Sequence, residues 1–141
     1  MRLGRYETLV RLGRGGMAEV FAARLSGEAG FAKLVAVKRM LAHLAADEAL
    51  VARFHDEARL AAYITSPYVV QTLDVGRSED GQPFIVLELV LGVSLAHLLE
   101  QRPLPSLPVR LELVTQAALG LADVHEACAP DGTPLDIVHR D

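Results

Sequence analysis

The feature that most constrains this chain is a glycine-rich loop with a strand-like segment on each side. Residues 6–12 and 19–24 have the short apolar pattern of β-strands, and residues 13–18 between them contain three glycines. We therefore expect a β-hairpin with a glycine-rich turn. The Rossmann fingerprint and the Walker loop both lead from a strand into a helix, and no Gly-Lys-Ser/Thr sequence ends this loop, so both of those phosphate-binding motifs are excluded.

The following residues predict a five-stranded antiparallel sheet with one inserted helix. Residues 33–40 complete a three-stranded meander, and residues 69–76 and 84–89 predict two further strands. Between them, residues 47–65 predict a helix, with Asp47 as its N-cap. The expected apolar stripe of this helix consists of Leu50, Phe54, Ala61 and Ile64, and Glu57 falls within it.

The pattern becomes helical after Gly92, which we interpret as the seam between two lobes. Ser94 can cap a short helix over residues 95–101, and a proline cluster separates that helix from a longer one over residues 108–127. The prediction is an α+β chain, with a sheet lobe over residues 1–91 and the start of a helical lobe over residues 92–141.

Composition excludes several classes of function. The 14 Lys and Arg against 18 Asp and Glu give a net charge of −4, so no sequence-wide positive field favours nucleic acid or an anionic membrane. No apolar run reaches the roughly 18 residues that span a bilayer, and the start lacks a secretory signal pattern. The lone Cys128 cannot form an internal disulfide, and we expect a cytoplasmic protein.

Lys38 is the first candidate for chemistry outside the loop. Strand alternation places Lys38 and Ala36 on one face and Val35 and Val37 on the other. A flat ring could then lie over Ala36 while the ammonium group reaches a phosphate. The alternative interpretation is a solvated lysine at a strand end.

Glu57 favours the functional interpretation of Lys38. A carboxylate within an apolar stripe loses hydration unless a cation meets it, and Lys38 lies on the neighbouring strand. The alternative is a local surface pair with Arg53, four residues earlier. We expect the pair between Lys38 and Glu57.

The chain ends in His139-Arg140-Asp141 after a short apolar segment. Alone, this tripeptide would be interpreted as a solvated tail. The order of glycine loop, strand lysine, helix glutamate, two strands, helices and His-Arg-Asp resembles the first part of a Ser/Thr protein kinase domain, and residues 15–20 are similar to the loop of bacterial members.

The resemblance implies a kinase-like fold, ATP as substrate and a set of roles. Lys38 would hold the α- and β-phosphates, Glu57 would orient Lys38, and Asp141 would be the catalytic base. The ATP-binding set it implies is Leu12, Gly13, Arg14, Gly15, Gly16, Met17, Ala18, Glu19, Val20, Ala36, Lys38, Leu87, Glu88 and Val90. Within this set Val20, Leu12 and Ala36 would enclose the adenine, Leu87 would be the gatekeeper, and the backbone of residues 88–90 would bond the adenine edge.

This chain departs from the family pattern in two ways. Ala18 stands at the third glycine position, from which we expect a slightly stiffer loop and a retained site. The family's magnesium ligands follow the catalytic aspartate, so Mg²⁺ is expected for a complete kinase while this chain offers no metal site. We therefore expect the 141 residues alone to be inactive. We also expect the helix over residues 108–127 to need the missing lobe or a partner to cover its apolar sides.

The sequence thus supports an ATP-dependent protein serine/threonine kinase, present as an incomplete domain, with a protein as the phosphoryl acceptor. A second hypothesis stays open. The chain could be a kinase remnant that binds a nucleotide or a partner protein without chemistry.

Overall fold

The computed structural model of the chain describes residues 1–137, and the chain forms two compact units. The first unit comprises Met1–Ala62 and Val70–Leu89, and the second comprises Tyr63–Val69 and the residues from Val90 onward. The boundary after Leu89 lies three residues before the predicted seam at Gly92.

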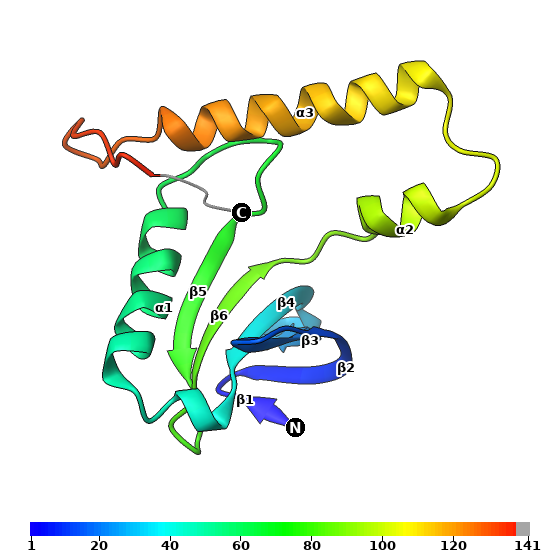
Figure 1. Ribbon diagram of the computed structural model, residues 1–141. Helices are drawn as coiled ribbons and strands as arrows, with labels where there is room; N and C mark the ends of the chain where they lie inside the picture. Colours follow the sequence, from blue (N-terminus) through cyan, green and yellow to red (C-terminus); the bar gives the residue numbers. More distant parts are fainter. Residues whose placement is uncertain (138–141) are drawn as a thin grey trace. The chain divides into compact units, whose positions relative to one another are not determined.

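The first unit is built on a six-stranded antiparallel sheet with the strand order β1-β2-β3-β4-β6-β5 (Figure 1). All five predicted strands are present, and the sixth, the two-residue β1, is too short to show alternation in the sequence. The strands are β1 (Arg2–Leu3), β2 (Tyr6–Arg14), β3 (Ala18–Ser26), β4 (Ala32–Met40), β5 (Thr72–Arg77) and β6 (Pro83–Glu88). Two short 3₁₀ turns, Glu28–Gly30 and Ala42–Leu44, follow β3 and β4.

Tyr6 reaches across the inner face of the sheet and connects β2 to β5. Its hydroxyl on β2 donates a hydrogen bond of 2.6 Å to the carboxylate of Asp74 on β5. Those strands stand four places apart in the sheet, a separation of roughly 19 Å if the sheet were flat. The sheet must therefore curl for the two side chains to meet, and the result is a half-barrel.

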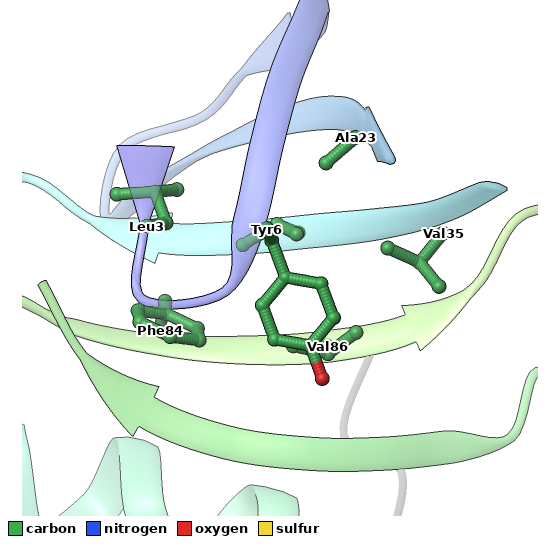
Figure 2. Close-up of a cluster of buried hydrophobic side chains, with 7 residues drawn as sticks. Leu3, Tyr6, Ala23, Val35, Phe84 and Val86 are labelled. Atoms are coloured by element: carbon green, nitrogen blue, oxygen red, sulfur yellow. The ribbon is translucent and has the colours of Figure 1, made fainter. Parts of the chain in front are cut away.

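The space inside this curl is filled by one apolar cluster. Figure 2 shows the Tyr6 ring lying across β4 and β6 with its hydroxyl directed beyond them. The Tyr6 and Phe84 rings meet edge to face, with their centroids 6.1 Å apart. The members of the cluster are Leu3, Tyr6, Ala23, Val35, Val37, Phe84 and Val86.

Asp74 is stabilised in its charged form at the rim of this cluster. Burial alone would raise the pKa of Asp74, but hydrogen bonds from the Tyr6 hydroxyl, the Val75 N–H and the Arg5 guanidinium outweigh it and lower the pKa. The pKa of the Tyr6 hydroxyl is raised, first by burial and then by its hydrogen bond to Asp74.

Helix α1 (Glu48–Ala61) packs in a second cluster of the same unit. The Asp47 carboxylate accepts hydrogen bonds from the N–H groups of Ala49 and Leu50 at 2.9 and 3.2 Å, which confirms the predicted N-cap. The helix ends four residues earlier than predicted, at Ala61. The second cluster contains Ala18, Met40, Val51, Phe54, Ala58 and Ile85.

The predicted apolar stripe of α1 was partly wrong. The buried residues of the helix are Val51, Phe54 and Ala58, so the face that packs on the sheet is rotated away from the Ala61 side. Four alanines in the helix allowed more than one apolar stripe, and only the packing selects one. Glu57 consequently lies outside the buried face.

The second unit contains the two predicted helices, α2 (Leu95–Glu100) and α3 (Leu107–His125). The Ser94 hydroxyl accepts from the His97 N–H at 3.1 Å, as its predicted role as N-cap requires. Gly120 of α3 is buried, and a Cβ there would be crowded because it would lie only 3.1 Å from the Tyr68 Cβ. Leu111 and Val114 on α3 are 58% and 66% exposed. No helix within residues 1–137 combines the length and apolar character needed to cross a bilayer.

We predict that Tyr6→Phe lowers the free energy of unfolding by about 1 kcal/mol at pH 7, because it removes a hydrogen bond to a charged, partly exposed acceptor. The pKa of Asp74 is lowered by folding, so its contribution is complete above the unfolded pKa of about 3.9 and is lost as the pH falls through the folded value. The difference in the free energy of unfolding between the unmodified protein and the Tyr6→Phe variant should therefore narrow below about pH 4. Urea unfolding followed by circular dichroism at several pH values measures both effects, and a difference that does not depend on pH would contradict the assignment.

Candidate active site

Strand pairing gathers four predicted site residues on one face of the sheet. Directly opposed residues of antiparallel strands share a face. Val20 of β3 opposes Lys38 of β4, and Ala36 of β4 opposes Leu87 of β6. The predicted alternation on β4 is confirmed as well, because Val35 and Val37 fill the inner cluster.

Lys38 and Glu57 form the predicted ion pair. The Lys38 Nζ lies 2.7 Å from Glu57 Oε1, and it also lies 5.7 Å from the centroid of the Phe54 ring. Within residues 1–137, no ion pair joins Glu57 to Arg53, the alternative partner. Three groups from β4 and α1 therefore meet at one point in the first unit.

The expectation that Glu57 is desolvated within an apolar stripe was wrong. The Glu57 side chain is 61% exposed and that of Lys38 is 30% exposed, so neither charge is deeply desolvated. A pair of this kind adds little to stability. Its effect is geometric: it holds the lysine ammonium at a fixed place on the sheet face while leaving part of it open to solvent.

The glycine-rich loop connects β2 to β3 through a short turn. The Gly15 N–H donates to the Ala18 carbonyl at 2.8 Å, and the Leu41 N–H donates to the Met17 carbonyl at 3.0 Å. Ala18 is 7% exposed and belongs to the second apolar cluster together with Met40. Its methyl group therefore anchors the end of the loop in the core, and a stiffer loop stays a prediction.

The other glycines are not required by contacts inside the chain. A Cβ on Gly13 or Gly16 would meet nothing within 4 Å, and a Cβ on Gly15 would lie 3.9 Å from the Ala18 carbonyl oxygen. The described residues therefore leave open space beside the loop backbone. Leu12 lies next to that loop and Met17 lies within it, and their side chains are 53% and 45% exposed.

Glu19 and Arg14 face away from Lys38. Glu19 lies opposite Arg39 in the strand register, on the other face of β3 from Val20. The hydrogen bond from Arg39, followed by the charge of Arg14, lowers the pKa of the Glu19 carboxyl although burial opposes the shift. Among the predicted ATP-binding residues, these two side chains therefore do not share the face of Lys38. Arg39 was not among the predicted site residues, although alternation after Lys38 places it on the opposite face.

The remaining candidates lie at or beyond the end of β6. Leu87 is half-buried, and the Glu88 N–H donates to the Gln71 carbonyl at 2.9 Å. Val90 belongs to the second unit, and Asp141 lies outside the described residues. Residues 1–137 hold no group of three His, Cys, Asp or Glu side chains arranged to bind a metal ion.

Residues 6–141 match the protein kinase domain family. The chain belongs to the protein kinase family. It is 41% identical over 142 residues to the tyrosine-protein kinase MasK of Myxococcus xanthus, covering 98% of this chain and 22% of that protein. It is 35% identical to the serine/threonine-protein kinase pkn3 of Myxococcus xanthus, covering 97% of this chain and 23% of that protein.

Solved kinase structures share the fold. The kinase domain of PknI from Mycobacterium tuberculosis superposes with a TM-score of 0.68 at 26% identity, over 89% of this chain and 49% of that one. PpkA-294 in its apo form gives 0.73 at 17% identity, over 98% and 59%, which bears on fold alone. The chain thus spans about a fifth of the length of these two relatives, and 49% and 59% of the two solved chains. The predicted kinase-like α+β fold is confirmed.

We predict that Phe54→Ala lowers the free energy of unfolding by about 3 to 5 kcal/mol, because the ring is buried between α1 and the sheet and its loss leaves a cavity. Arg53→Ala is the matched control, since that neighbouring side chain is exposed and should change stability by less than about 0.5 kcal/mol. Urea titration of both variants provides the measurement. Equal stabilities would mean that α1 does not pack through Phe54.

Proposed function

We propose that this chain supplies the nucleotide-binding part of an ATP-dependent protein serine/threonine kinase. The observation that supports this most strongly is the contact of 2.7 Å between Lys38 and Glu57, on the sheet face that also carries Val20, Ala36 and Leu87. A cation and apolar surface together suit a ligand that has a flat ring at one end and phosphates at the other. ATP is such a ligand.

Lys38 binds the α- and β-phosphates in this proposal. The Lys38 side chain is 30% exposed, so we expect it to donate to a phosphate while Glu57 restrains it. Phosphoryl transfer depends on positioning and charge neutralisation, and a pre-positioned ammonium loses little freedom when the nucleotide binds. Glu57 therefore acts through Lys38 and does not contact the nucleotide.

The glycine-rich loop and the apolar residues bind the rest of the nucleotide. The open space beside Gly13 and Gly16 allows the loop backbone to approach phosphate oxygens closely. Val20, Ala36 and Leu12 enclose the adenine, and Leu87 limits the depth of its pocket. We assign residues 1–91 to the sheet lobe of the kinase and residues 92–141 to the start of its helical lobe, a division supported by the unit boundary after Leu89.

Asp141 is the proposed base for the chemical step. Its carboxylate accepts the proton of a substrate hydroxyl, whose oxygen forms a bond to the γ-phosphorus as the bond from that phosphorus to the β–γ bridging oxygen breaks. The products are a phosphorylated protein and ADP. In the complete kinase Mg²⁺ would accompany ATP and neutralise charge on its phosphates, and residues 1–137 do not hold a cluster of ligands for it.

Serine/threonine specificity is proposed from the relatives. The names of pkn2, pkn3 and pknA2 state serine/threonine kinases, whereas MasK is named as a tyrosine kinase. Phosphorylation of peptides that differ only in having Ser, Thr or Tyr at the acceptor position decides between them. Transfer to the Tyr peptide alone would overturn the proposed specificity.

We predict that Lys38→Met lowers kcat/KM for ATP by about 100-fold or more in a catalytically active protein that contains this chain, since one pre-positioned charge is lost. Lys33→Met is the matched control, because Lys33 is an exposed lysine on the same strand and should leave kcat/KM within about twofold. Transfer of ³²P from labelled ATP measures both. Normal turnover by the Lys38→Met variant would overturn the proposed function.

A further inference from the structure

Three arginines surround one glutamate behind the glycine-rich loop. Glu19 Oε2 lies 3.2 Å from Arg39 Nη2 on β4, and Glu19 Oε1 lies 3.4 Å from Arg11 Nη1 and 3.6 Å from Arg14 Nη1 on β2. We refer to Glu19, Arg11, Arg14 and Arg39 as the Glu19 clamp. It connects three adjacent strands at the end of the hairpin that carries the loop.

The centre of the Glu19 clamp is more sheltered than the other ion pairs of the described chain. The side chains of Glu19 and Arg39 are 12% and 15% exposed, whereas those of Glu7 and Arg24, which pair across β2 and β3, are 49% and 47% exposed. The Arg39 guanidinium also lies 5.5 Å from the centroid of the Phe21 ring. Sheltered charges are screened less by solvent and salt, so this pair restrains its strands more strongly than an exposed one.

The two ends of the loop are held by different means. The β3 end is fixed by the hydrogen bond from Leu41 to Met17 and by burial of Ala18. At the β2 end the register shifts between Arg11 and Gly13, and Gly13 has no neighbour within 4 Å of its Cβ position. In the described chain, β1 pairs with β2 only at Tyr6 and Glu7, far from the loop. Strand pairing reaches this end of the loop, because Gly13 lies opposite Val20 and Arg14 lies opposite Glu19. The Glu19 clamp adds side-chain contacts to that pairing, through Arg11 and Arg14, whose own side chains are 56% and 57% exposed.

We propose that Glu19 is a positioning residue that fixes the β2 end of the glycine-rich loop through Arg11 and Arg14, and so sets the height of the loop over the phosphates of ATP. This inference rests on the proposed function. Arg39 is the structural link, because it follows Lys38 on β4 and projects to the opposite face. One strand would then hold the phosphate ligand on one face and the anchor of the loop on the other.

The first test is hydrogen–deuterium exchange on the 141-residue chain. Glu19→Gln should speed exchange of the backbone amides of residues 15–17 by about three- to tenfold, because a charge-assisted restraint on the loop is lost. Glu7→Gln is the matched control. It removes the 2.6 Å ion pair with Arg24 between the same two strands and should leave loop exchange unchanged. Equal loop exchange in the two variants would overturn the proposal.

Arg14→Gln keeps the proposal testable if Glu19→Gln does not fold. It removes the contact on the loop side but leaves the pair between Glu19 and Arg39, so loop exchange should rise by a smaller factor of about two- to threefold. Unchanged loop exchange in this variant would also overturn the role of the clamp.

The second test measures kinetics in a catalytically active protein that contains this chain. Glu19→Gln should raise KM for ATP by about three- to tenfold and leave kcat within about twofold, because loop position affects nucleotide binding before the chemical step. Faster loop exchange with an unchanged KM would overturn the link to ATP. If the proposed function is wrong, the result is different. The Lys38→Met variant then keeps normal turnover, whatever the KM of the Glu19→Gln variant.

Discussion

The second half of strand β4, residues 35–40, contributes to both apolar clusters, and the first unit depends on that constraint. Val35 and Val37 fill the inner cluster under the Tyr6 ring, while Met40 packs against Ala18 and Ile85 in the second cluster. Lys38 lies between those two sets of contacts along the strand. A backbone packed on both sides cannot shift without disturbing both clusters, so a flexible lysine side chain begins from a fixed position.

Stability and the orientation of Lys38 depend on different residues around that strand. The ion pair between Lys38 and Glu57 is too exposed to contribute much to folding, whereas Phe54, 2% exposed beside it, anchors α1. The helix is therefore held by apolar packing, and the ion pair is left to orient a charge. This division agrees with a site in which Lys38 exchanges contacts when a ligand binds.

Neighbouring residues beside the loop are also divided between the two faces of the sheet. Glu19 and Val20 are neighbours in the sequence, yet alternation sends the carboxylate to three arginines and the valine to the face of Lys38. Two successive residues of β3 thus lie on opposite faces of the sheet, as Lys38 and Arg39 do on β4. Both of these opposed pairs lie close to the start of β3, where the glycine-rich loop ends.

Local patterns in the sequence determined the elements of this protein. Alternation predicted the five longer strands, Asp47 and Ser94 predicted two helix caps, and the order of the motifs predicted the kinase family, because each of these signals is carried by neighbouring residues. Only the tertiary structure decided the curl of the sheet, the buried face of α1, the exposure of Glu57 and the arginines around Glu19. Each of these depends on contacts between residues far apart in the chain, such as Tyr6 and Asp74, and a local pattern of side chains does not specify which distant partner will be met.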